Sequence, residues 1–296
     1  MSELQPDKSG LREVRRILVE WIAAATAALG KKKVTDTDIH DARKQLKKAR
    51  AALRLLRGSI GEIAYRRENA ALRDAARPLG VARDSKASIA ALEALGERHE
   101  SIKLDKFRRL LGRERTQARR ALTHTLISKQ RTSLRAVTKR SERWRLQGDD
   151  WEVIGDGLRR SYRRGRKRFA TAKESRDTQC LHEWRKQVKY LWHQLQILQP
   201  LRPGKIEEIA DRCHKLAEKL GDDHDLAVLR AKIAGHAKSF AHPKDLDELL
   251  RLLDRRRVQL QDEAFDIGSR LFKGKPRAFV LRIGKHWEAW RDSATE

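Results

Sequence analysis

A seventeen-residue segment occurs twice in this chain, and it constrains the fold more than any other feature. Residues 40–56 read HDARKQLKKARAALRLL, and residues 182–198, displaced by 142 positions, read HEWRKQVKYLWHQLQIL. Seven positions are identical, in the order His, Arg, Lys, Gln, Lys, Leu and Leu. A match of this length and order argues for a duplicated element and against coincidence.

Each copy has the apolar periodicity of an amphipathic helix. The apolar positions recur in steps of four and three, which places them on one stripe of a helix with 3.6 residues per turn. They are Ala42, Leu46, Ala49, Leu53 and Leu56 in the first copy, and Trp184, Val188, Leu191, Leu195 and Leu198 in the second. We expect both stripes to pack in a core.

The opposite face of each predicted helix is basic, and we call this face the cationic strip. In the first copy it comprises Arg43, Lys44, Lys47, Arg50 and Arg54. In the second copy it keeps His182, Arg185, Lys186 and Lys189 and then continues with His193 and Gln196. The same residue types thus recur at equivalent positions on both helices.

The charge of the whole chain points to a polyanionic partner. Lys and Arg number 68 against 41 Asp and Glu, a formal net charge of +27. Such a charge opposes compaction unless an anion screens it. The chain is not expected to be disordered, because its apolar residues, although only 39% of the total, are periodic.

Cysteine content and the first residues indicate a cytoplasmic protein. The two cysteines, Cys180 and Cys213, are too few for a disulfide framework. The start, MSELQPDKSG, has no apolar core of a signal peptide, and no apolar stretch approaches 18 uncharged residues. We expect neither export nor a membrane span.

Helical periodicity covers nearly the whole chain and predicts an all-α fold with two sets of six helices. The first set is predicted at 11–29, 36–58, 61–78, 82–98, 102–127 and 130–146. The second set is predicted at 151–171, 177–199, 205–220, 223–239, 243–272 and 276–293. Polar capping residues precede both repeated segments, Thr35-Asp36-Thr37-Asp38 in one case and Asp177-Thr178 in the other.

A second repeated motif extends the duplication beyond one helix. Leu79-Gly80-x-x-Arg83-Asp84 aligns with Leu220-Gly221-x-x-His224-Asp225 at an offset of 141. We therefore predict two helical bundles, residues 1–148 and 149–296, related by a pseudo-two-fold axis within one domain. The repeated helices are expected to face a shared basic groove.

These motifs together resemble the CHAD family, the conserved histidine α-helical domain. The resemblance rests on His-x-x-Arg-Lys-x-x-Lys present twice, on Leu-Gly-Asp-Asp-His-Asp-Leu-Ala-Val-Leu at 220–229, and on Tyr65-Arg66-Arg67-Glu68-Asn69-x-x-Leu72-Arg73. It covers nearly the entire chain. It implies an all-helical fold with internal two-fold symmetry, binding of inorganic polyphosphate along a basic channel, and association with polyphosphate granules. Some family members are fused to triphosphate-tunnel enzymes, and this chain contains no such second domain.

The resemblance implies ligand contacts at His40, Arg43, Lys44 and Lys47 and at their counterparts His182, Arg185, Lys186 and Lys189. This chemistry suits a phosphate thread, because Arg grips two phosphate oxygens in a fork and Lys acts as a mobile point charge. Affinity should fall steeply with salt, by analogy with nucleic acids. The histidines are expected to donate to phosphate oxygens and to bind more strongly as they protonate near pH 6.5. Further candidates are Arg50, Arg54, Arg73, Arg77, Arg159, Arg163, Arg166, Lys215 and Lys219.

Other interpretations remain open. The strip could be a solvated helix face, the charge could serve non-specific nucleic-acid binding, and a metal-dependent polyphosphate or triphosphate hydrolase is a third alternative. Asp222-Asp223-His224-Asp225 could hold a metal, but such a run more often caps a helix. The tryptophans could stack on bases, but their spacing favours the core. Because the strip carries no carboxylates at matching positions, we expect binding without catalysis and no cofactor.

Overall fold

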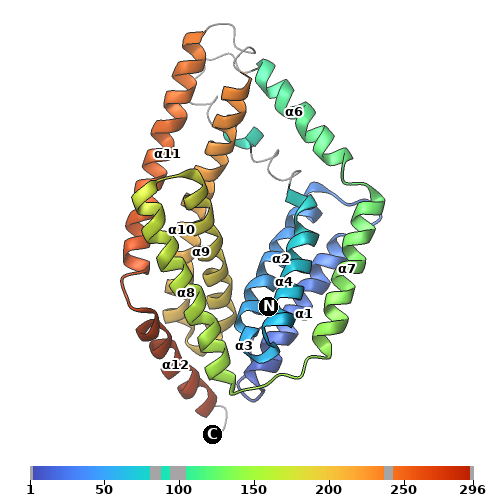
Figure 1. Ribbon diagram of the computed structural model, residues 1–296, viewed down its shortest axis with the longest axis vertical. Helices are drawn as coiled ribbons and strands as arrows, with labels where there is room; N and C mark the ends of the chain where they lie inside the picture. Colours follow the sequence, from blue (N-terminus) through green and yellow to red (C-terminus); the bar gives the residue numbers. More distant parts are fainter. Residues whose placement is uncertain (1–2, 81–87, 94–104, 237–242, 294–296) are drawn as a thin grey trace.

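The structure is a computed structural model that describes residues 3–80, 88–93, 105–236 and 243–293. Within these ranges it is all-helical and contains no strand, as the periodicity predicts. Figure 1 shows the helices, whose bounds are α1 (Gly10–Ala28), α2 (Asp36–Leu55), α3 (Arg57–Ile60), α4 (Glu62–Ala76), α6 (Asp105–Arg120), α7 (His124–Glu142), α8 (Asp150–Ser175), α9 (Thr178–Leu198), a 3-10 turn η1 (Gln199–Leu201), α10 (Pro203–Gly235), α11 (Pro243–Leu271) and α12 (Pro276–Asp292).

Two of the predicted helix boundaries are wrong. The helices expected at 205–220 and 223–239 are one uninterrupted helix, α10. The acidic run does not cap a new helix, because Asp223 is buried within α10 and accepts hydrogen bonds from Arg257 and Gln261 of α11 at 3.0 and 2.8 Å. The break expected near 128–130 lies at Thr123, whose hydroxyl accepts from the Leu126 amide and starts α7. The helix predicted at 82–98 falls mostly outside the described residues.

The repeated segments form α2 and α9, and these two helices pack against each other near the middle of the molecule (Figure 1). All ten residues of the two apolar stripes have no exposed surface, so the predicted core faces are confirmed. α2 also packs on α1, α4 and α8, and α9 on α8 and α10.

The main core is continuous from α1 across α2 and α9 to α10 and α12. Across the contact between the repeated helices, the buried side-chain amide of Gln194 donates to the Ala51 carbonyl at 3.1 Å. Nearby, Gly157 lets α8 approach α2 closely, because a Cβ there would lie 2.7 Å from the Leu55 Cα. The two repeated helices are therefore joined by a buried hydrogen bond as well as by apolar packing, and α8 lies close against one of them.

A second, smaller core lies at the end of the molecule drawn at the top of Figure 1. It joins Phe107 and Leu111 of α6 to Leu229 of α10 and Leu253 of α11. An ion pair between Lys232 and the Glu114 carboxylate supports this contact. The helix α6, which precedes the predicted midpoint of the chain, thus packs against helices that follow it.

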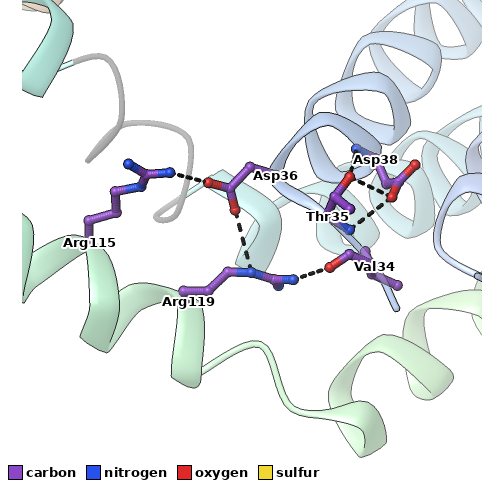
Figure 2. A network of polar contacts seen from close by, with 6 residues as sticks. All are labelled: Val34, Thr35, Asp36, Asp38, Arg115 and Arg119. Atoms are coloured by element: carbon purple, nitrogen blue, oxygen red, sulfur yellow. Dashed lines mark hydrogen bonds and ion pairs between the residues drawn. The ribbon is translucent and has the colours of Figure 1, made fainter. Parts of the chain in front are cut away.

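The N-terminus of α2 is capped as predicted and is also tied to α6. Thr35 and Asp38 form a capping box, in which the Thr35 hydroxyl accepts from the Asp38 amide and the Asp38 carboxylate accepts from the Thr35 amide. Figure 2 shows Arg115 and Arg119 of α6 reaching Asp36, at 2.6 and 3.4 Å, and Arg119 also donates to the Val34 carbonyl. At α9, the Asp177 carboxylate accepts from two amides of the first turn. No helix in the described part of the chain is both long and apolar enough to span a membrane.

Candidate functional site

Two adjoining pockets are built on the cationic strips of α2 and α9. The first, pocket A, has a volume of about 280 Å³ and lies between α2, the end of α4, and α9, with His224 of α10 at its edge. The second, pocket B, has a volume of about 360 Å³ and lies between α2, α9 and α10. Neither pocket is lined by the other helices of the described chain.

Four cationic residues line both pockets, and we call them the shared tetrad. They are Arg43 and Lys47 of α2, and Arg185 and Lys189 of α9. These are the equivalent Arg and second Lys of the two repeated motifs. The two strips therefore do face one another across a common space, which the sequence alone could not establish.

The two arginines of the tetrad occupy equivalent seats, each against a glycine. The Arg43 guanidinium lies 2.7 Å from the position that a Cβ would take at Gly80, and the Arg185 guanidinium lies 2.7 Å from that position at Gly221. Arg43 also donates to the Ala76 carbonyl at 3.3 Å. In both copies, the glycine of the Leu-Gly motif leaves space for the arginine of the His-x-x-Arg motif, since a side chain at either glycine would contact the guanidinium.

Most of the residues predicted for the site line one of the pockets. Besides the tetrad, His40 and Lys44 line pocket B, and pocket A is lined by Arg50, Arg73, Arg77, His182 and Lys186. His40 and His182 are each the fifth residue of their helix, so their equivalence in sequence is also an equivalence in structure.

The other predicted residues line neither pocket. Arg54 stacks on the Tyr190 ring, 3.6 Å from its centroid, and donates to the Arg50 carbonyl at 2.7 Å, so it joins α2 to α9. Lys219 pairs with Glu263 of α11 at 2.5 Å. The remaining members of this set, on α8 and α10, are exposed: Arg159, Arg163, Arg166 and Lys215.

Some cations of the pockets have a carboxylate partner on their own helix. Lys186 pairs with Glu183 at 2.7 Å, and Arg73 and Arg77 both pair with Asp74, at 3.0 and 2.7 Å. Exposed pairs of this kind contribute only about 0–1 kcal/mol each. A phosphate group that arrives in pocket A would therefore displace these three pairs at low cost.

The environment of His182 departs from what its sequence position suggested. Burial, followed by the charges of His224, Lys186 and Arg185, lowers the pKa of His182 to about 4. The His182 and His224 rings lie 4.4 Å apart between centroids. The expectation of protonation near pH 6.5 is therefore wrong for the ligand-free protein, in which this ring is neutral at pH 7. His193, buried in the neighbouring part of α9, is also neutral, because burial lowers its pKa to about 3.

Sequence analysis missed the contribution of α10. Its residues His214, Glu218, Asp222 and Asp225 line pocket B. Their spacing of four, four and three is that of one helix face, and this signal was available once α10 was read as one helix. The strips do lack matching carboxylates of their own, but α10 brings three carboxylates beside them. No group of three metal-ligating side chains close enough to hold an ion occurs in the described ranges.

The tryptophans largely follow the core prediction. Trp184 has no exposed surface and Trp287 is buried. Trp192 is only partly buried and lines pocket B, where its ring stacks on His214 at 4.2 Å between centroids and 10° between planes. One tryptophan thus belongs to the pocket wall.

Comparison with known proteins gives a family match and a structural match. The family model described as "CHAD domain" matches residues 14–234. The fold is similar to the crystal structure of the CHAD domain from the plant Ricinus communis, with a TM-score of 0.64 and 16% sequence identity over 92% of this chain and 94% of that one. At this identity the structural likeness speaks to the fold alone. No curated protein matches the sequence.

Proposed function

This chain belongs to the CHAD domain family, and from that premise we propose that it binds inorganic polyphosphate in the paired pockets between α2, α9 and their neighbours. The proposal includes the internal duplication, with residues 1–148 and 149–296 as two related bundles that contribute one strip each. It also includes binding without catalysis and without a cofactor. A cytoplasmic location at polyphosphate granules follows from the family resemblance alone.

The observation that carries the proposal is the shared tetrad. Polyphosphate has about one negative charge per phosphate and no bases, so its complement is a row of cations with no shape requirement beyond spacing. Arg43 and Lys47 on one helix oppose Arg185 and Lys189 on the other, and all four line both pockets. A flexible thread that passes between the helices would meet both strips.

The lining of pocket A adds further support. Eight Lys and Arg side chains line it and no carboxylate does. Like charges held this close repel one another in the ligand-free protein, and an anion relieves that repulsion. Burial lowers the pKa of Arg50, Tyr190 opposes this shift, and the charges of Arg54 and Arg73 lower the pKa further.

The test is a competition titration of labelled long-chain polyphosphate against DNA across a range of salt. We expect polyphosphate to displace DNA at moderate salt. Replacement of the tetrad by Gln should weaken polyphosphate binding by at least tenfold and reduce the slope of log affinity against log salt by about one unit per cation removed. A matched control replaces Arg159, Arg163, Arg166 and Lys215, which removes the same charge from residues that line neither pocket.

Equal losses in the two variants would mean that general basicity, and not the pockets, binds the ligand. Tight DNA binding that polyphosphate does not displace would instead favour a nucleic-acid-binding protein. Metal-dependent release of phosphate by the purified protein would contradict binding without turnover, and the carboxylates of pocket B make that assay a necessary part of the test. Arg185 is buried, so a variant limited to Lys47 and Lys189 separates loss of binding from loss of fold.

A further inference from the structure

The two pockets share the tetrad but differ in the sign of the charges around it. Pocket A has no carboxylate in its lining. Pocket B is lined by Glu218, Asp222 and Asp225 of α10, which face five Lys and Arg side chains of α2 and α9. A polyanion that enters pocket B is therefore attracted by one wall and repelled by another.

Asp222 lies at the centre of the repelling wall. Glu218 precedes it by four residues and Asp225 follows it by three, so all three project from one face of α10. Loss of solvation beside the neighbouring helices raises the pKa of Asp222, and the charges of Asp225 and Glu218 raise it further. The charges of Lys219 and Arg185 oppose this shift. The Asp222 carboxylate thus lies within electrostatic reach both of its acidic neighbours and of a tetrad arginine.

Two of the three carboxylates of the acidic wall lie on the surface of α10. Glu218 and Asp222 are exposed, whereas the neighbouring Asp223 is buried and fixes α10 to α11 through Arg257 and Gln261. Neighbouring carboxylates on one helix face repel one another, and here the cations of α2 and α9 offset that repulsion. Their position in the lining of pocket B points to an effect on what enters the pocket.

Resting on the proposed function, we propose that Glu218, Asp222 and Asp225 determine how polyphosphate is distributed between the paired pockets and how tightly it binds: they weaken binding in pocket B, so the strand is held mainly in pocket A. The tetrad cations at the boundary are then shared between the ligand and the acidic wall. The carboxylates compete with phosphate for the same guanidinium and ammonium groups, so the affinity stays below what the number of cations allows and the strand remains releasable.

The test uses the full chain with Glu218→Gln, Asp222→Asn and Asp225→Asn, singly and together. We expect the triple variant to bind long-chain polyphosphate roughly tenfold more tightly and Asp222→Asn alone roughly threefold, in keeping with like-charge repulsion near a surface. The salt slope should become steeper by about one unit, because the strand then also neutralises Lys44, the one Lys or Arg in the lining of pocket B that does not line pocket A as well. Asp211→Asn is the matched control, since this exposed carboxylate is on α10 and lines neither pocket.

Unchanged affinity in the triple variant, with the wild type binding normally, would overturn this inference and leave the proposed function intact. Weaker binding by the variant, only when Mg²⁺ is present, would also overturn it, since the carboxylates would then hold phosphate through a divalent ion. Absence of binding by both wild type and variant would instead overturn the proposed function. Should the triple variant fold poorly by circular dichroism, the exposed Asp222→Asn change alone decides the sign of the effect.

Discussion

At the scale of single residues, the site depends on how two arginines are seated. Arg43 and Arg185 line both pockets, and each guanidinium lies against a glycine of the repeated Leu-Gly motif. Glycine weakens a helix interior by up to about 1 kcal/mol relative to alanine. Gly221 is such an interior position in α10. Glycine there lowers the stability of the helix but leaves room for the Arg185 guanidinium.

This arrangement gives a prediction for Gly221→Ala. The added methyl group would meet the Arg185 guanidinium, whose nearest atom lies 2.7 Å from the Cβ position, and would push it from its seat. We expect polyphosphate binding to weaken severalfold while the melting temperature stays equal or rises, because alanine favours the helix. Isothermal titration and thermal melts check the two effects. Gly204→Ala is the control, since no atom lies within 4 Å of a Cβ there.

The histidine of α9 gives a prediction about pH. The pKa of His182 is about 4 in the free protein, and a bound phosphate oxygen would raise it, so binding takes up a proton. Affinity should therefore be flat where the ring stays neutral in both states and should increase as pH falls below its pKa in the complex. Titrations between pH 8 and 5 should show a smaller increase for His182→Gln than for the wild type. Identical pH profiles would exclude protonation of this ring on binding.

Prediction from sequence succeeded where a residue's role followed from its own helix. Both apolar stripes and most of the strip are where periodicity places them, because side-chain direction on a helix is fixed by position. It failed where the role depends on a second helix. Arg54 lies on the strip by angle, yet it stacks on Tyr190 of α9 and leaves the pocket. The acidic face of α10 became part of the site only through packing.

At the scale of elements, α2 and α9 are positioned by side-chain caps at their first turns, and α2 also by α6. Asp36 receives Arg115 and Arg119, while Thr35 and Asp38 close the capping box (Figure 2). The cap lies about one turn before His40, which lines pocket B, so it fixes the part of α2 from which this side chain projects.

Removing this cap should therefore lower stability. We expect Thr35→Ala to reduce the free energy of unfolding by about 1 kcal/mol. Thr37→Ala is the control, because the hydroxyl at that position makes no capping bond.

The pKa of Asp38 is lowered to about 2 by hydrogen bonds from Lys31 and Thr35. Its contribution is present above the ordinary value of 3.8 and is lost as pH falls through about 2, so the destabilisation by Asp38→Asn should shrink in acid. Chemical denaturation at two pH values measures both effects.

The wrong boundary inside α10 has a physical cause at this scale. Leu220-Gly221 followed by acids reads as a helix end and a new cap, because glycine commonly terminates helices. Here the glycine is present because the Arg185 guanidinium needs its space, and the acids line a pocket or bond to α11. From sequence alone, a glycine that ends a helix looks the same as a glycine that makes room for a neighbouring side chain.

At the scale of the whole molecule, α2 packs against α9, and α8 packs on both of them (Figure 1). The repeat in the sequence predicted this pairing of two equivalent helices. It did not predict that α6 would pack with α10 and α11 in a second core, because that contact joins residues more than 100 positions apart and leaves no periodic trace. Periodicity in the sequence predicts the helices, but the contact of α6 with α10 and α11 depends on long-range packing.

The uninterrupted course of α10 has a mechanical consequence. At 33 residues it is about 50 Å long, and it carries the acidic wall near its middle and apolar anchors for α6 and α11 toward its far end. Because α10 has no break between pocket B and the second core, we expect a displacement of this helix at pocket B to reach its contacts with α6 and α11.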